Sequence, residues 1–255
     1  MTGKTMAVLH NAAHTFAAGL NVESGSGGQV VPVPFAGGQG WKVIYEPFTD
    51  GIDFTSTTAP KWTVTATGTG TASPAGAHGV SLLPKTTSDN SGLHLQWETP
   101  TLVFGGSSKK WYFETRSTVT SAGGTMAQAE SVVGFTSDVQ TTGFVDTLGT
   151  AWAWNDGVAF CHLDGDTEIS CVIGNAGTLQ SIGLGQDYVT AVALRLGCYY
   201  DGSSYHVYVD GEEKATAGRV TAIGTTACGA SLYTKSGEAQ DKDLLVNYLY
   251  LAVEL

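Results

Sequence analysis

The sequence predicts an all-β protein, a two-sheet antiparallel jelly-roll sandwich that follows an extended N-terminal arm. Glycine makes up 34 of the 255 residues and charged residues only 14%, a composition typical of many short strands joined by tight turns. Strand-like segments with turn residues between them recur from Trp41 to the C-terminus. Helical periodicity is nearly absent from this part of the chain, and only Ala127–Val132 shows a trace of it.

The first 45 residues are expected to form an arm that does not belong to the sandwich. Ala7–Leu20 has a helical pattern, and the Gly/Ser-rich segment Glu23–Gln29 follows it. An extended segment, Val30–Phe35, leads to a second flexible joint at Gly37–Gly40. This part of the chain has few apolar residues with which to fold alone. We therefore assign residues 1–45 to an N-terminal arm and residues 46–255 to one sandwich domain.

Ten segments carry clear strand signals. In Lys110–Thr118, Trp111 and Phe113 share one face of the predicted strand, while Tyr112 and Glu114 share the other. About ten to fourteen strands at this spacing predict two packed antiparallel sheets. The ten segments are Trp62–Thr67, Leu93–Trp97, Lys110–Thr118, Ser131–Thr136, Gly157–Leu163, Glu168–Ile173, Val189–Tyr200, Tyr205–Val209, Glu213–Thr216 and Leu244–Leu255.

The charge of the chain excludes some classes of partner. It has 12 basic and 23 acidic residues, a net charge of −11. Phosphate backbones and anionic membranes attract clustered Lys and Arg, and no basic cluster exceeds Lys109-Lys110, so we expect neither partner. No segment approaches the run of about 18 apolar residues that marks a membrane helix. Met1–Leu20 also lacks the continuous apolar core of a signal peptide, so we expect synthesis in the cytosol without processing.

Four cysteines, at positions 161, 171, 198 and 228, lack the CxxC spacing of a zinc cluster. Cys161 and Cys171 flank the turn-like run Asp164-Gly165-Asp166. A hairpin loop of about three or five residues would place their side chains on one sheet face, and a loop of about two or four on opposite faces. The sequence therefore allows a disulfide between them, although buried free thiols are favoured in a cytosolic protein.

Four segments together resemble strands of the concanavalin A-like lectin/glucanase superfamily, including its laminin-G-like and SPRY-like members. They are Lys110–Glu114 (KWYFE), Val132–Phe135 (VVGF), Asp156–Phe160 (DGVAF) and the hairpin sequence Tyr199–Gly211. The last contains a strand, a DG turn, an alternating strand and a second DG turn, which alone is a generic hairpin signal. The resemblance covers about residues 45–255 and implies the jelly-roll fold. It is less specific for function, because this fold hosts lectins, hydrolases and structural modules.

The acidic run Asp164–Glu168 is the nearest match to the paired carboxylates of glycoside hydrolases with this fold, which stand at alternate positions of one strand. Gly165 and the flanking strands instead predict a turn, and the first acid is Asp where the family pattern has Glu. We therefore expect neither enzyme activity nor a required cofactor. Loop carboxylates also suit calcium. The loop acids are Asp164, Asp166, Asp201 and Asp210, of which Asp164 and Asp166 are the candidate ligands. Asp residues in short turns, however, commonly bond their own backbone.

The sequence offers no anchor for a nucleophilic triad, because a GxSxG run is absent and the six histidines lie in predicted tails, loops or alternating strands. Among the latter, His206 is expected on the polar face of its strand. Carbohydrate binding needs an exposed aromatic platform beside polar loop residues, and core packing is the alternative for every such ring. The candidate carbohydrate-binding residues are Trp152, Trp154 and Asn155, in the run AWAWND, and behind them stand Tyr199, Tyr200 and Tyr205.

Within the superfamily, the Gly/Ser/Thr-rich composition and the runs WYFETR and DGVAFCHLDGD resemble domains of tailed-bacteriophage virion proteins. This resemblance implies a non-catalytic virion structural protein, most specifically a capsid decoration (cement) protein. In this hypothesis the arm, residues 1–45, binds the major capsid protein or another virion protein. The protein is then a homo-oligomer that is made in the host cytoplasm and resides in the virion. The alternative is a carbohydrate-recognition module of a tail fibre or another receptor-binding protein, with a glycan as partner.

Overall fold

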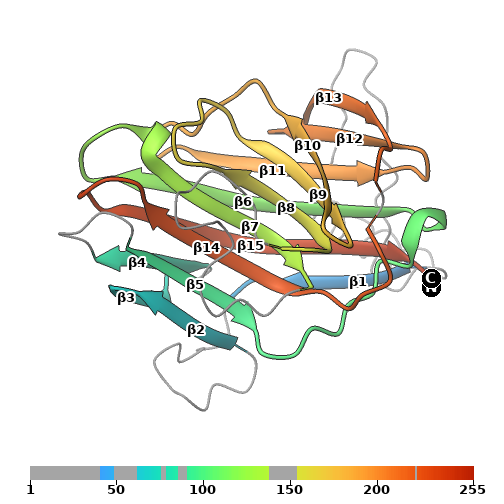
Figure 1. Cartoon of the computed structure of the whole chain (residues 1–255), viewed down its shortest axis with the longest axis horizontal. Helices are drawn as coiled ribbons and strands as arrows, with labels where there is room; N and C mark the ends of the chain where they lie inside the picture. The colour runs from blue at the N-terminus through green and yellow to red at the C-terminus, as the bar shows by residue number, and fades with distance from the viewer. Residues whose placement is uncertain (1–40, 49–61, 76–78, 86–90, 138–153, 222) are drawn as a thin grey trace, which may run out of the picture.

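A computed structural model of the chain describes residues 41–48, 62–75, 79–85, 91–137, 154–221 and 223–255. Within these residues, fifteen strands form two antiparallel sheets that pack face to face, as the sequence predicts (Figure 1). The described chain also contains two short 3-10 helices, Gly106–Ser108 and Met126–Gln128. Neither is long and apolar enough to cross a membrane.

The larger sheet has eight strands. They are β1 (Trp41–Glu46), β3 (Thr69–Pro74), β4 (Val80–Lys85), β6 (Trp111–Ser121), β11 (Ala193–Tyr200), β12 (Ser204–Val209), β13 (Glu212–Gly218) and β15 (Lys242–Glu254). Their order is β13-β12-β11-β6-β15-β4-β3, and β1 pairs with the C-terminal half of β15. The long central strands β6 and β15 therefore organise this sheet, with the hairpins β11–β12 and β12–β13 at one side.

The second sheet has seven strands and lies in front of the first in Figure 1. They are β2 (Trp62–Thr67), β5 (Gly92–Trp97), β7 (Ala129–Thr136), β8 (Gly157–His162), β9 (Ser170–Asn175), β10 (Thr178–Gly183) and β14 (Gly229–Ser236). Their order is β10-β9-β8-β7-β14-β5-β2. Because neighbours in both sheets are antiparallel and many are distant in sequence, the topology is a jelly roll rather than a simple meander.

Two expectations about the chain's organisation need correction. The predicted arm extends to residue 45, but β1 begins at Trp41 and pairs along its whole length with β15, so residues 41–45 belong to the sandwich. Residues 1–40 lie outside the described residues, and the arm itself stays a prediction. The helical trace at Ala127–Val132 is only the end of the 3-10 turn Met126–Gln128, after which β7 begins.

The main core lies between the inner faces of the two sheets, where alternation along each strand directs the apolar side chains. The ring of Phe113 on β6 stacks on that of Phe160 on β8, with centroids 5.5 Å apart. Trp111 is 1% exposed and packs edge-on against Phe104 at 5.6 Å. Large buried rings such as these add to the apolar area that stabilises the sandwich.

The outer face of each sheet carries a further apolar cluster, so the central strands are buried on both sides. On the eight-stranded sheet the cluster is Tyr112, Tyr199, Tyr208, Tyr250 and Ala252. On the seven-stranded sheet it is Val132, Trp154, Ala159, Cys161, Val172 and Tyr233. Strands buried on both faces lose the simple alternation of apolar and polar residues that makes strands easy to recognise in a sequence.

All four cysteines are buried free thiols in the structure. Cys171 is directly opposite Phe160 and belongs to the main core, whereas Cys161 is opposite Ser170 and belongs to the outer cluster of the seven-stranded sheet. Of the two arrangements that the sequence left open, the structure therefore has the one with the two side chains on opposite faces.

Candidate binding face of the eight-stranded sheet

The tryptophans that the sequence singled out do not form an exposed platform in the described part of the chain. Trp154 is only 2% exposed and packs on the outer cluster of the seven-stranded sheet, beside Val132 and Cys161. Asn155 is exposed just before β8. Trp152 lies outside the described residues. Trp154 therefore packs against the protein, and its ring is not accessible to a ligand.

The three tyrosines proposed to stand behind these residues separate onto two faces. Tyr200 and Tyr205 are fully buried in the main core, with ring centroids 4.9 Å apart and both rings against Trp111. Tyr199 points the other way, onto the outer face of the eight-stranded sheet, where its ring stacks on His206 at 6.0 Å. Only Tyr199 therefore belongs to a face that a ligand can approach.

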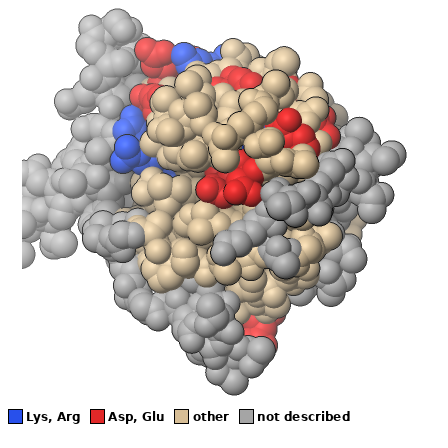
Figure 2. Space-filling model, turned by 90° about the vertical axis from the view of Figure 1, so that its left-hand side faces the viewer, with Lys and Arg blue, Asp and Glu red and all other residues tan. Residues whose placement is uncertain are grey.

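The two candidate calcium ligands, Asp164 and Asp166, lie in the β8–β9 connection. In that connection the Gly165 amide donates to the Ala127 carbonyl, and the Asp164 carboxylate lies against Gly237 in the β14–β15 connection. Figure 2 faces this end of the sandwich and shows acidic side chains in several separate places among mostly uncharged residues. Among the described residues, no group of three His, Cys, Asp or Glu side chains is arranged to hold a metal ion.

Polar side chains on the outer face of the seven-stranded sheet are buried and bond one another. Gln96 donates to Ser231 at 3.0 Å, and the Thr136 and Ser231 hydroxyls lie 2.7 Å apart. Glu130 and Lys235 form an ion pair of 3.0 Å in which the carboxylate side chain is fully buried. Their contacts and burial fit a structural role, and accessible polar groups lie instead on the other sheet.

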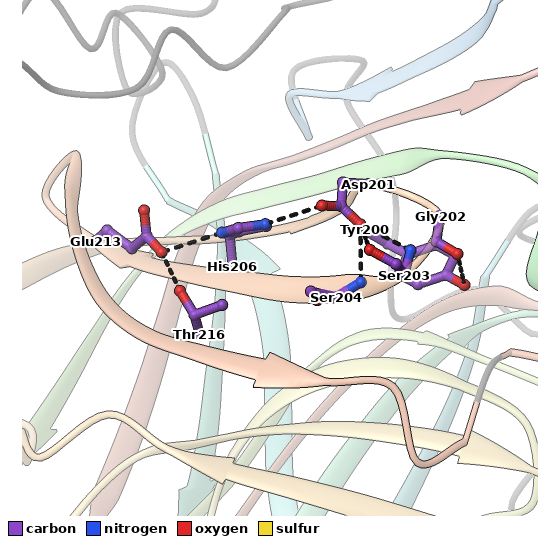
Figure 3. Close-up of polar contacts among 8 residues, drawn as sticks. All are labelled: Tyr200, Asp201, Gly202, Ser203, Ser204, His206, Glu213 and Thr216. Carbon is purple, nitrogen blue, oxygen red and sulfur yellow. Dashed lines mark hydrogen bonds and ion pairs between the residues drawn. The ribbon is translucent and has the colours of Figure 1, made fainter.

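The β11–β12 hairpin supplies such groups on the outer face of the eight-stranded sheet (Figure 3). Asp201 follows β11 directly, and one of its carboxylate oxygens accepts hydrogen bonds from the amides of Ser203 at 2.7 Å and Ser204 at 2.8 Å. The Ser203 hydroxyl donates to the same oxygen at 2.9 Å. Asp closes tight turns in this way because its short side chain reaches the backbone two and three residues ahead. The turn therefore fixes the carboxylate in one orientation.

His206 lies between two carboxylates, because strand register places it beside Tyr199 on one side and near β13 on the other. Its Nε2 atom is 3.3 Å from the second oxygen of Asp201, and its Nδ1 atom is 3.0 Å from Glu213. The Thr216 hydroxyl also donates to Glu213. We call this set the His206 chain: Ser203, Asp201, His206, Glu213 and Thr216 (Figure 3).

The hydrogen bonds along the His206 chain separate it from a catalytic triad despite the shared residue types. In a triad the histidine contacts the nucleophilic hydroxyl and the carboxylate lies behind the ring. Here the Ser203 hydroxyl bonds Asp201 and the Thr216 hydroxyl bonds Glu213, so neither hydroxyl reaches the imidazole. The two carboxylates also lie at opposite edges of the ring and do not converge on one point. The arrangement suits hydrogen bonding to a ligand rather than activation of a nucleophile.

The electrostatics of the His206 chain keep its first carboxylate ionised. Partial burial acts to raise the pKa of Asp201, but the hydrogen bonds from Ser204, Ser203 and His206 outweigh it and hold the pKa well below its ordinary value. Tyr199, which supports the imidazole ring, has its pKa raised by burial and by the neighbouring Asp201. The hairpin thus presents a fixed negative charge beside an aromatic ring.

A second polar cluster on the same face is centred on Glu114 of β6, which is 2% exposed. Its two carboxylate oxygens accept hydrogen bonds from the hydroxyls of Tyr112 at 2.8 Å and Tyr248 at 2.5 Å. Burial raises the pKa of Glu114, while the two tyrosine hydrogen bonds and the nearby positive charge of Arg195 oppose that rise. This cluster joins β6, β11 and β15 across the sheet.

Solved structures that resemble this chain include lectins. Lectin UEA-II, complexed with galactose, has a TM-score of 0.55 at 11% identity, covering 84% of this chain and 99% of that chain. Peanut lectin, with a 9-mer peptide, has a TM-score of 0.55 at 12% identity, and the match covers 83% of this chain and 97% of the lectin chain. The exoplasmic/lumenal domain of VIP36, with Ca²⁺ and mannose bound, has a TM-score of 0.53 at 11% identity, covering 81% and 88%.

At this level of identity the likeness establishes the fold, which is that of the concanavalin A-like lectins. No protein-family model matches the sequence, and a search of curated proteins also finds no match. The bacteriophage context that the sequence suggested has no support from these structures.

The sequence predicts the positions of individual members of the candidate binding face but not their contacts with one another. His206 was expected on a polar strand face and lies on one, and Asp201 was recognised as a turn acid. Glu213 and Thr216 drew no attention, because their contact with His206 depends on the register of β12 with β13. The usable signal was the pair of DG turns, which together fold three strands into neighbours.

Proposed function

We propose that the chain is a non-catalytic carbohydrate-recognition module that binds glycans on the outer face of its eight-stranded sheet, at the His206 chain. The observation that carries the proposal is a fixed, accessible row of hydrogen-bonding groups in which the side chains of Asp201 and Glu213 are 34% and 30% exposed. The lectin fold supports the same class of function. Neither hydroxyl of the His206 chain contacts the imidazole, as a nucleophile would, and this supports a function without catalysis.

The chemistry of the His206 chain fits sugar hydroxyls. Ionised carboxylates accept hydrogen bonds from hydroxyl donors, and hydrogen bonds to charged groups are stronger than those between neutral groups. The Ser203 and Thr216 hydroxyls add groups that both donate and accept. Because the backbone amides of the turn and the ring of Tyr199 already hold these side chains, little conformational entropy is lost when a sugar binds.

The test is a glycan array with the whole chain, followed by calorimetric titration of the best ligand. Glu213→Gln should weaken binding about tenfold, because the charged acceptor becomes a neutral amide. Glu212→Gln is the matched control. Glu212 is the adjacent residue on β13, it is also exposed, and its carboxylate pairs with Lys214 at 2.8 Å rather than with His206.

Binding that falls in Glu213→Gln and stays unchanged in Glu212→Gln supports this site. Equal loss in both variants would show that only net charge matters and would contradict a site at the His206 chain. A wild-type chain that retains no glycan on the array would contradict the function itself.

A virion structural role is a second candidate, and it is supported by the runs WYFETR and DGVAFCHLDGD, which resemble phage virion domains. In this role the arm attaches the module to a capsid or tail protein, and a glycan-binding sandwich would then serve receptor recognition. Deleting residues 1–40 should abolish attachment to particles while the sandwich keeps its thermal unfolding transition. Particles that still carry the truncated chain would contradict attachment through the arm.

A further inference from the structure

Two arginines face each other on the outer face of the eight-stranded sheet. Arg116 of β6 is directly opposite Arg195 of β11, and Tyr248 of β15 is opposite Arg116 on its other side. Like charges at directly opposed positions of neighbouring strands destabilise a sheet. The pair therefore has a cost in the free protein that a bound anion would remove.

The described carboxylates offset the charge of this pair only in part. Arg116 is exposed, and neither guanidinium forms an ion pair with a described Asp or Glu. The Nε atom of Arg195 is buried without a hydrogen-bond partner in the described structure. Glu114 is the nearest acid along β6 and interacts with the charge of Arg195, but its oxygens accept hydrogen bonds from two tyrosine hydroxyls rather than from a guanidinium. The exposed guanidinium of Arg116 is thus available to an external acceptor, and the half-buried Arg195 beside it has a donor without a partner.

An aromatic pair lies beside the arginines. Tyr45 of β1 is 42% exposed, and its ring centroid is 6.0 Å from that of Tyr248. The hydroxyl of Tyr248 donates to Glu114, which fixes the second ring against the sheet. A rigid aromatic surface next to guanidinium groups can contact the apolar face of a sugar while the arginines bind its charged substituent.

We infer that Arg116 and Arg195 bind the carboxylate of an acidic sugar residue, such as a uronic acid, whose ring lies on Tyr45 and Tyr248. Guanidinium groups bind carboxylates through paired hydrogen bonds, which gives both affinity and orientation. Arg195 is four residues from Tyr199 along β11, or about 13 Å. An oligosaccharide of a few units spans that distance, so this inference rests on the proposed function and extends its site.

Two matched sugar pairs test the charge preference directly. Methyl glucuronide and methyl glucoside differ at C6, where a carboxylate replaces a hydroxymethyl group, and methyl galacturonide and methyl galactoside differ in the same way. Titrations followed by NMR should show at least one uronide binding about tenfold or more tightly than its neutral partner. The difference should shrink as the salt concentration rises, because the guanidinium of Arg116 is exposed.

Three variants connect the preference to the arginine pair. Arg116→Gln should remove the preference for the uronide and leave binding of the neutral sugar unchanged. Arg195→Lys keeps the charge but loses the planar fork, and should reduce the preference several-fold. Lys214→Gln, which removes one positive charge on β13 from a lysine paired with Glu212, is the control and should behave as wild type.

The outcomes separate this inference from the proposed function. Neutral sugars that bind as well as uronides, or a preference that survives Arg116→Gln, would overturn the arginine site and leave glycan recognition at the His206 chain intact. If neither member of either pair binds and the glycan array is also empty, the proposed function fails and the arginine site fails with it.

Discussion

At the scale of single residues, the outer face of the eight-stranded sheet is organised by a carboxylate that water does not reach. Glu114 is buried, and an ionised carboxylate is stable there only because the hydroxyls of Tyr112 and Tyr248 and the charge of Arg195 replace its hydration. The same hydrogen bonds fix two of the rings on this face. A residue that could have been a catalytic acid thus acts as a structural centre for the surface around it.

Glu114→Gln tests this account through the pH dependence of stability. The pKa of Glu114 is raised in the folded state, so the folded protein holds the proton more tightly than the unfolded chain. Its contribution to stability is therefore largest at low pH and falls as pH rises through the folded pKa. The difference in unfolding free energy between wild type and Glu114→Gln should therefore be greater at pH 4.5 than at pH 7. Urea unfolding at both values measures it, and a difference independent of pH would contradict a raised pKa.

Single residues also show where prediction from sequence ends. The buried position of Trp154 could not be read from the run AWAWND, because a tryptophan beside a strand can pack on either face or face solvent. The outcome depends on Val132 and Cys161, which strand pairing brings together from β7 and β8. By contrast, the alternation in β6 that puts Trp111 and Tyr112 on opposite faces is local, and it is confirmed.

At the scale of elements, the β12–β13 turn joins the two strands that complete the His206 chain. Asp210 and Gly211 form a two-residue connection in which both have positive φ, 53° and 88°. Such turns match the twist of the strands they join, and they favour Asp-Gly because most other residues are strained there. The sequence predicted this turn, and the register that follows from it brings Glu213 near His206.

Gly211→Ala should destabilise the hairpin, because a side chain at positive φ costs about 1–2 kcal/mol. Gly218→Ala, at the end of β13, is the control, since a Cβ there meets nothing within 4 Å and the backbone does not have positive φ. The control should be neutral or slightly stabilising. Chemical unfolding compares the two variants, and equal stability would contradict a strained turn.

The strands that sequence analysis missed share a physical cause. β14 is the clearest case, since Gly229–Ser236 is buried throughout and lies between β7 and β5. Its outward residues, Tyr233 and Lys235 among them, are covered rather than solvated. The order of polar and apolar residues along β14 therefore does not indicate which side of the strand faces solvent. β3 is rich in Gly, Ser and Thr and carries no strand signal in the sequence. Segments with local alternation, such as β2, β6 and β12, were predicted correctly.

At the scale of the whole molecule, the sandwich buries many tyrosines, and their ionisation is linked to unfolding. Burial raises the pKa of Tyr188 and of Tyr250 to about 12, above their ordinary value of 10.0. The contribution of these tyrosines to the free energy of unfolding should therefore be fully present below about pH 10, where the tyrosines of the unfolded chain begin to ionise. It should be lost progressively as pH rises toward the folded values.

Alkaline titration followed by near-ultraviolet absorbance and circular dichroism tests this linkage. We expect a large part of the tyrosinate signal to appear together with the loss of native circular dichroism, in one cooperative step above pH 10. Full tyrosinate formation near pH 10 with the native spectrum intact would show that these rings are solvated in the folded protein, against the packing described.

The central claim is that the sandwich binds sugars on the outer face of its eight-stranded sheet, and mapping amide chemical shifts during a sugar titration tests it most directly. With a ligand identified on the glycan array, the account predicts the largest shifts at the hairpin residues 199–206, with accompanying shifts on β13. For an acidic sugar the shifts should extend to Arg116 and Arg195. Shifts confined to the seven-stranded sheet or to the end loops would contradict it.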